Sequence, residues 1–172
     1  LRFYEFERGQ ILIDGHDIKD YSQAELRRHI GLVLQDPFLY HGTVASNIKM
    51  YQEGLSQQDI EEAAKFVDAH DFIHQLPLTY DAPVTERGAA FSSGQRLART
   101  VATKPKILIL DEATANIDSE TEELIQASLK KMRQGRTTIA IAHRLSTIQD
   151  ANCIYVLDKG QIIESGSHEE LL

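Results

Sequence analysis

The sequence predicts an α/β fold: a mainly parallel sheet with flanking helices, a helical segment inserted into it, and an antiparallel hairpin near the C-terminus. Lys106–Leu110 is nearly all apolar, which is typical of a strand buried on both faces of a parallel sheet. Short apolar runs alternate with helical patterns along both flanks of the chain. Residues 42–97 carry mostly helical patterns, so they interrupt this alternation.

Short runs rich in apolar and β-branched residues indicate the strands of this fold. Asp158-Lys159-Gly160 separates the last two runs and is typical of a hairpin turn. The candidate strands are Gln10–Ile13, Gly31–Leu34, Lys106–Leu110, Thr137–Ala142, Cys153–Leu157 and Gln161–Glu164.

The helix starts are marked by a serine placed three residues before an acidic residue. The serine can accept hydrogen bonds from free backbone N–H groups, and the acid is favourable in the first turn. These pairs are Ser22 with Glu25, Ser56 with Asp59, Ser119 with Glu122, and Ser167 with Glu170. Two sets of apolar residues have the spacing of one buried helix face: Ile60, Ala63, Ala64 and Val67, and Leu124, Ile125, Leu129 and Met132.

Length and composition indicate one soluble domain with a substantial core. The chain has 172 residues, 42% of them hydrophobic and 26% charged, with a net charge of −8. Such acidity argues against a general nucleic-acid-binding protein. The longest apolar run, Cys153–Leu157, is far too short to span a membrane. There is no signal peptide, and the lone Cys153 cannot form an internal disulfide, so we expect a reducing compartment.

Asp111 and Glu112 are the sharpest candidates for chemistry, because they end the buried strand Ile107–Leu110. Ligands of open α/β folds bind at the carboxyl edge of the sheet. The first acid could hold Mg²⁺, and the second could polarise a water for attack on a phosphate. Taken alone, the two acids could equally well just begin a loop or helix.

Three weaker signals lie next to the ends of other predicted elements. Ser92, Ser93, Gly94 and Gln95 precede a helical segment, where backbone N–H groups and hydroxyls could face an anion. His143 follows the strand Thr137–Ala142, and Gln35 follows Gly31–Leu34. Each signal alone has a structural explanation: a helix cap, a structural histidine, or a turn residue before Asp36-Pro37.

Together and in this order, these segments resemble the ATP-binding domain of ATP-binding-cassette (ABC) transporters. Leu34–Pro37 resembles the glutamine loop, Phe91–Gln95 the signature motif, and Leu110–Glu112 the end of Walker B. Ala115–Asp118 resembles the D-loop, and Ala142–Arg144 the switch histidine. Thr85-Glu86-Arg87-Gly88 is similar to a segment typical of exporters, and the resemblance covers essentially the whole chain.

The resemblance implies a P-loop NTPase-like core and a partial ATP-binding domain over residues 1–172. The helical subdomain with the signature would cover about residues 42–97, and residues 1–41 and 98–172 would form the catalytic core. It further implies ATP and Mg²⁺ as ligands, and a head-to-tail dimer with a second ATP-binding domain. A transmembrane domain fused upstream would place the chain at the cytoplasmic face of the membrane, with no nucleic-acid partner.

The resemblance also assigns roles to individual residues. Gln35 would contact Mg²⁺ and water and couple to the transmembrane domain, and Asp111 would support Mg²⁺. Glu112 would be the general base, and His143 would contact the γ-phosphate. The signature would reach the γ-phosphate of the nucleotide held by the opposite subunit, through Ser92, Gly94 and Gln95. Ser93 replaces a glycine, a change the family tolerates, and Asp118 would lie at the subunit interface.

The sequence departs from the family pattern in two places. It contains no Gly-x-x-x-x-Gly-Lys-Ser/Thr phosphate loop, which family members carry upstream of the position of Leu1. Leu1–Tyr4 resembles the end of the helix that follows this loop. The stretch from Gln95 to Asp111 is shorter than the family pattern by about four residues, or roughly one helical turn. We therefore expect this chain alone to be weak or inactive as an ATPase.

Three functions remain open from the sequence. The first is the ATP-hydrolysing domain of an exporter, favoured by Glu112 and His143. The second is a non-catalytic module that contributes only its signature face to a partner, favoured by the missing phosphate loop. The third is a soluble ABC-type ATPase acting on DNA or ribosomes, which would usually have long insertions and a more basic surface.

Overall fold

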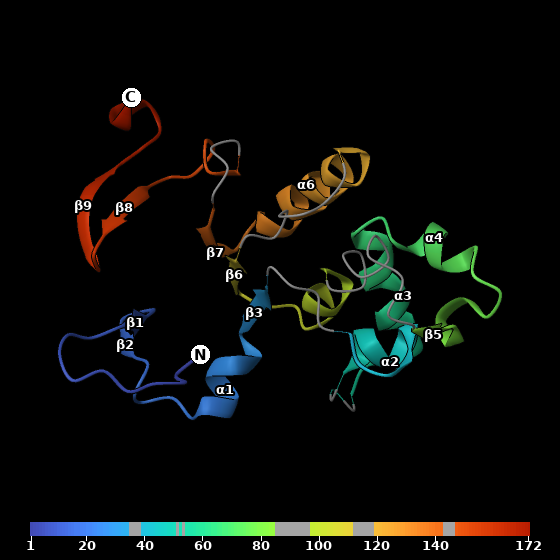
Figure 1. Ribbon diagram of the computed structural model, residues 1–172. Coiled ribbons are helices and arrows are strands. Elements are labelled where there is room, and N and C mark those ends of the chain that lie inside the picture. The colour runs from blue at the N-terminus through green and yellow to red at the C-terminus, as the bar shows by residue number, and fades with distance from the viewer. Residues whose placement is uncertain (35–38, 51, 53, 85–96, 112–118, 143–146) are drawn as a thin grey trace. The chain divides into compact units, whose positions relative to one another are not determined.

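The computed structural model describes the whole chain except residues 35–38, 51, 53, 85–96, 112–118 and 143–146 (Figure 1). The described residues divide into two compact units, Leu1–Ile139 and Ala140–Leu172. Within the described part of the chain, no helix combines the length and the apolar character needed to cross a bilayer.

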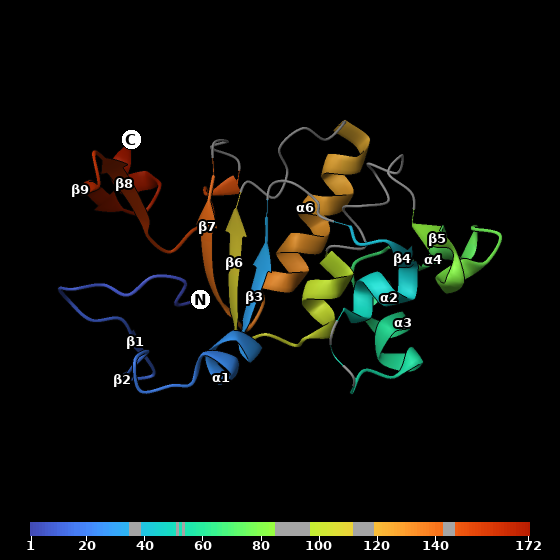
Figure 2. The same cartoon turned by 60° about the horizontal axis from the view of Figure 1, so that its bottom comes forward.

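A three-stranded sheet organises the fold, with β6 (Ile107–Asp111) between β3 (Ile30–Val33) and β7 (Thr137–Ile141). Figure 2 shows the three strands side by side. β3 and β6 are parallel. At the start of β7, the backbone N–H of Thr137 donates to the carbonyl of Lys106, at 3.2 Å. The predicted parallel sheet is therefore confirmed.

Strand β6 is buried more completely on one face than on the other. Leu108 and Leu110 are 0% and 2% exposed, whereas Ile107 and Ile109 are half-buried. Because alternate residues of a strand point to opposite faces, the core lies on the side of the two leucines. The prediction that this strand is buried on both faces thus holds fully for one face. Among the described residues, the other face is only partly covered.

Gly31 on β3 allows the helical residues 97–102 and the segment that follows them to approach the sheet closely. A Cβ atom at this position would lie 2.7 Å from Cγ of Pro105 and 2.8 Å from Cγ2 of Thr100. Neither the proline ring nor the short threonine side chain can turn away freely. We therefore expect Gly31→Ala to lower the free energy of unfolding by about 1–3 kcal/mol. The measurement is a urea denaturation curve, with Gly54→Ala, which meets no atom within 4 Å, as the control that should change little.

The helix starts predicted from serine–acid pairs are confirmed for α1 (Gln23–Arg28) and α3 (Gln57–Phe66). The hydroxyls of Ser22 and Ser56 each accept the N–H of the acidic residue three positions later, at 3.2 Å. Helix α6 (Ser119–Arg133) begins at the predicted serine. Ser167 and Glu170 do bond to each other, but only the 3₁₀ turn η3 (Glu169–Leu171) follows.

The inserted segment is helical, with a small two-stranded sheet that the sequence did not predict. Helix α2 (Val44–Lys49) precedes α3, and α4 (His70–His74) and the 3₁₀ turn η1 (Thr79–Asp81) follow it. Strands β4 (Gly42–Thr43) and β5 (Pro83–Val84) pair antiparallel near the two ends of the described part of the insertion. The expected apolar face of α3 is confirmed, because Ile60, Ala63, Ala64 and Val67 are all buried.

A histidine–tyrosine contact links two of these helical turns. Nδ1 of His70 lies 2.9 Å from the hydroxyl of the buried Tyr80, and the rings of His70 and His74 are 4.2 Å apart. Burial raises the pKa of Tyr80 to about 12, with a smaller contribution from the charge of Glu61. Desolvation and the neighbouring His74 lower the pKa of His70.

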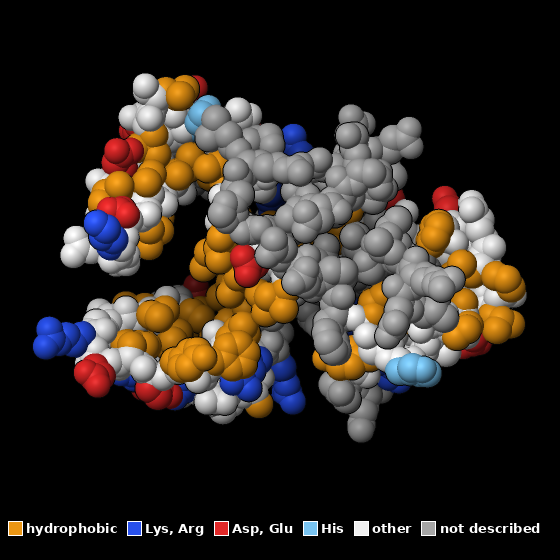
Figure 3. Space-filling view, viewed as in Figure 1, with side chains coloured by type: hydrophobic (Ala, Val, Ile, Leu, Met, Phe, Trp, Pro, Cys, Tyr) orange, Lys and Arg blue, Asp and Glu red, His pale blue; other side chains and the backbone are white. Residues whose placement is uncertain are grey.

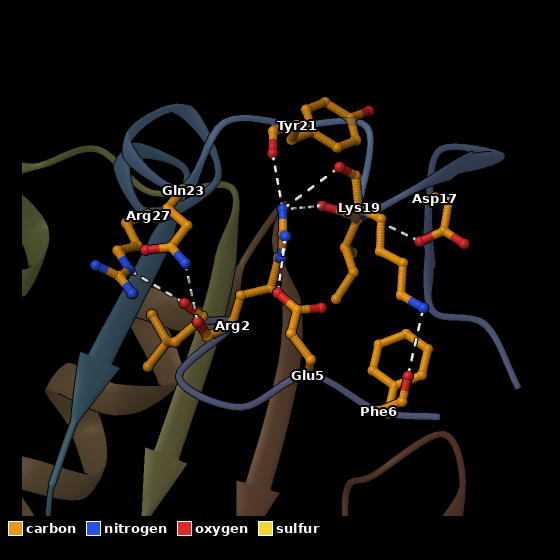
Figure 4. Close-up of polar contacts among 10 residues, drawn as sticks. Arg2, Glu5, Phe6, Asp17, Lys19, Tyr21, Gln23 and Arg27 are labelled. Atoms are coloured by element: carbon orange, nitrogen blue, oxygen red, sulfur yellow. Dashed lines mark hydrogen bonds and ion pairs between the residues drawn. The ribbon is translucent and has the colours of Figure 1, made fainter. Parts of the chain in front are cut away.

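The N-terminal segment, which carries the short hairpin of β1 (Leu12–Ile13) and β2 (His16–Asp17), is held by Arg2 (Figure 4). Its guanidinium donates to the carbonyl of Tyr21 at 3.0 Å and to Glu5 at 2.9 Å. Arg2 has a φ of +50°, and Leu1–Tyr4 form no helix, so the expected end of a helix is wrong there. Figure 3 shows hydrophobic side chains exposed over this segment, where Phe3 and Tyr4 are 68% and 89% exposed.

The C-terminal unit contains the predicted hairpin. Strands β8 (Ile154–Asp158) and β9 (Gln161–Gly166) pair antiparallel around the turn at Lys159-Gly160. An irregularity in register between Val156 and Leu157 shifts the pairing along the hairpin. The prediction of an antiparallel hairpin near the C-terminus is confirmed.

Candidate functional site

The parallel pairing of β3 and β6 brings two predicted motifs to one edge of the sheet. Val33 on β3 pairs with Leu110 on β6, so Leu34 and Asp111 leave the sheet at the same, carboxyl, edge. Gln35 follows the first of these residues in the chain, and Glu112 follows the second. Ligands of open parallel sheets bind outside this edge.

Asp111 is the one predicted site residue that the structure describes. It is the last residue of β6 and is half-buried, so it lies at the end of a strand with partial access to solvent. The other predicted residues lie outside the described part of the chain: Gln35, Ser92, Ser93, Gly94, Gln95, Glu112, Asp118 and His143. Thr85–Gly88 lies outside it as well.

The donor types fit a hard divalent cation. The carboxylate of Asp111 and the amide oxygen of Gln35 are oxygen ligands, which Mg²⁺ prefers. Mg²⁺ usually takes only one or two protein ligands and completes its shell with water and phosphate oxygens. Among the described residues, no group of three or more His, Cys, Asp or Glu side chains is arranged for a metal.

The sequence did not predict a polar cluster of Tyr40 and Arg99 around the buried Asn47. Asn47 is 1% exposed, and its side-chain oxygen accepts the backbone N–H of Tyr40 at 2.8 Å. Its backbone carbonyl accepts Nε of Arg99 at 2.7 Å. Burial lowers the pKa of Arg99, and the nearby Tyr40 opposes this shift. The signal in the sequence was an asparagine between Val44 and Ile48, on the buried face of a short helix.

Comparison with known proteins places the chain in a family. The sequence profile described as "ABC transporter" matches residues 1–115. An ABC transporter ATP-binding protein of Streptococcus pneumoniae, exp8, is 72% identical over 176 residues, covering 100% of this chain and 30% of that protein. The ATP-dependent lipid A-core flippase of Syntrophus aciditrophicus is 50% identical over 175 residues, covering 99% of this chain and 29% of the flippase.

A solved structure agrees with the sequence matches. A bacterial Atm1-family ABC exporter with ATP bound superposes with a TM-score of 0.88 at 43% identity, covering 99% of this chain and 30% of the exporter. The chain thus spans under a third of the length of these relatives. The chain belongs to the ABC transporter family, and what it shares with that family is the ATP-binding part.

Proposed function

We propose that this chain is the ATP-binding and ATP-hydrolysing part of an ABC exporter, and that it acts at the cytoplasmic face of a membrane. The observation that carries the proposal is the register of β3 and β6, because the strands that lead into the predicted glutamine loop and the predicted Walker B end run parallel and end at one sheet edge. The likeness to an ATP-bound exporter supports the same function. A Bacillus subtilis relative at 50% identity is named an ATP-binding/permease protein, which supports a transmembrane domain joined to this part.

Each predicted residue has a role in this proposal. The carboxylate of Asp111 and the amide of Gln35 hold Mg²⁺, which when bound neutralises charge on the phosphates of ATP. Glu112 accepts the proton of the attacking water, and His143 donates a hydrogen bond to the γ-phosphate. The boundaries near residues 42 and 97 separate the helical subdomain from the catalytic core.

The signature acts across a dimer. We propose that Ser92, Ser93, Gly94 and Gln95 present hydroxyl, amide and backbone N–H donors to the γ-phosphate of ATP held by a second ATP-binding domain. Asp118 lies at that interface. Charge neutralisation and alignment of the water are therefore complete only when two domains close head to tail.

A mixed-dimer experiment tests this arrangement in the proposed full-length transporter. Asp111→Asn disables the Walker B side of a site, and Ser92→Arg disables the signature side. With one change in each copy, both lesions fall in the same site, so one intact site and part of the ATPase activity remain. With both changes in one copy and a wild-type partner, each site carries a lesion and activity is lost. The reverse pattern would mean that each domain completes its own site.

A second candidate is a non-catalytic module that contributes only its signature face to a complete partner. It is the alternative that the sequence leaves open, and in it the Asp111 of this chain takes no part in hydrolysis. The same mixed dimers distinguish it, because a non-catalytic copy would tolerate Asp111→Asn without loss of activity.

A further inference from the structure

Two adjacent side chains of the helical residues 97–102 contact the chain on both sides of Gln35. Arg99 bonds to Asn47, which in turn holds Tyr40, five residues after Gln35. Thr100 bonds to Leu32, three residues before Gln35. The described part of the helix that provides both contacts starts at residue 97, two residues after Gln95, the last residue of the predicted signature.

The contact after Gln35 is made by Asn47, whose side-chain oxygen and side-chain nitrogen each form two hydrogen bonds. The side-chain amide of Asn47 donates to the carbonyls of Tyr40 at 2.8 Å and Thr43 at 3.0 Å. Its side-chain oxygen accepts the N–H of Tyr40 at 2.8 Å and Nη2 of Arg99 at 3.2 Å. Both backbone polar groups of Tyr40 are thus held by one buried side chain, which fixes the chain at this point.

Arg99 binds the same asparagine twice and also contacts the tyrosine ring. Its Nε donates to the backbone carbonyl of Asn47 at 2.7 Å, and its guanidinium carbon lies 5.6 Å from the centre of the Tyr40 ring. A half-buried guanidinium is costly to leave unpaired, and the two nitrogens have fixed relative directions. The contact therefore resists sliding or rotation of one segment against the other.

The contact before Gln35 joins the same helix to strand β3. The hydroxyl of Thr100 donates to the carbonyl of Leu32 at 3.3 Å. Gly31, the neighbour of Leu32, leaves room for this approach, because a Cβ there would lie 2.8 Å from Cγ2 of Thr100. The helix is thus attached to the strand that leads into Gln35 as well as to the segment that leaves it.

We propose that Arg99 and Asn47 are positioning residues that couple the signature segment to the glutamine-loop segment. The inference rests on the proposed function and extends it. Arg99 is four residues after Gln95, and Tyr40 is five residues after Gln35. A displacement of the Arg99 helix therefore moves the described residues from which both segments start. Loss of this link leaves the nucleotide contacts in place but misaligns them with each other.

The test compares Arg99→Gln with wild type in the proposed full-length transporter, measuring Mg-ATP hydrolysis. Because small misplacements in an active site cost up to about 100-fold in rate, we expect kcat to fall by about 10- to 100-fold. We expect KM for ATP to stay within about threefold, since a positioning defect acts on the transition state. Arg99→Lys keeps the charge but not the two-nitrogen fork, so it should rescue only part of the loss.

Arg136→Gln is the matched control for simple loss of stability. Arg136 is also half-buried, and its Nε donates to a backbone carbonyl, that of Pro105, at 2.9 Å. This control should retain wild-type kcat. If Arg99→Gln fails to fold, Asn47→Leu replaces it, because leucine has nearly the same shape but loses the side-chain contacts to Tyr40 and to Nη2 of Arg99. A fall in kcat for this variant supports the link, and unchanged kcat contradicts it.

A double-mutant cycle separates a positioning role from a general loss of stability, because it measures whether the effects of the two substitutions on kcat are independent. If Arg99 and Asn47 act as one unit, the variant with both Arg99→Gln and Asn47→Leu should have the kcat of the worse single variant. Independent, additive losses would overturn the proposal, as would wild-type kcat in Arg99→Gln or an equal loss in Arg136→Gln. Wild-type hydrolysis that survives Glu112→Gln would instead refute the proposed function, so the two failures are distinguishable.

Discussion

Glu112→Gln in the proposed full-length transporter should lower kcat for ATP hydrolysis by about 10²–10⁴-fold, the usual contribution of general base catalysis. Glutamine has nearly the same shape as glutamate but cannot accept a proton from the attacking water. In the sequence, Glu112 directly follows Asp111, the last residue of β6. The side chain makes its contribution in the transition state, so ATP binding should persist while turnover stops.

The measurement combines phosphate release with ATP binding on the same preparation. Glu164→Gln is a suitable control, because Glu164 is an exposed acid on β9 and has no part in the proposed site. This control should hydrolyse ATP at the wild-type rate. A Glu112→Gln variant with kcat within about threefold of wild type would exclude Glu112 as the general base.

The long elements could be predicted because their residues carry a periodic signal. Strands β3 and β6 and helices α3 and α6 were found from apolar runs and from spacing of the type Ile60, Ala63, Ala64 and Val67. Strands β4 and β5 have only two residues each, so they show no alternation of apolar and polar residues. Their pairing also joins residues about 40 positions apart in the sequence. The start of helix α2 was not predicted, because its capping box consists of Thr43 and Ser46. The pattern that marks the other helix starts has an acidic residue three positions after the capping serine.

The site could be predicted as a set of motifs, but not as an arrangement. The sequence placed Gln35 and Asp111 after strands, and the register of Val33 with Leu110 shows that these strands are neighbours and parallel. The roles of Glu112, His143 and the signature residues stay predictions. The cluster of Asn47 and Arg99 could not be predicted, because its members are 52 residues apart and a buried asparagine does not reveal its partner.

The 172-residue chain by itself should bind Mg-ATP with a Kd weaker than about 1 mM and should show no turnover. In P-loop proteins, the lysine, the backbone N–H groups and the hydroxyl of the phosphate loop provide most contacts to the β- and γ-phosphates and to Mg²⁺. The chain contains no such motif. Asp111 ends β6 and Glu112 follows it in the sequence, and two carboxylates repel a triphosphate unless a cation lies between them.

Titration calorimetry measures the Kd of the 172-residue chain for Mg-ATP. A second titration measures the same Kd for the Asp111→Asn variant of the chain. If the carboxylates repel the nucleotide, Asp111→Asn should bind no more weakly than the unchanged chain, which is opposite to the effect expected in a complete site. The full-length transporter is the positive control, where the same substitution should weaken Mg²⁺-dependent binding. Turnover by the chain alone that disappears in Glu112→Gln would contradict the prediction, because it would mean that the remaining groups suffice for phosphate binding and catalysis.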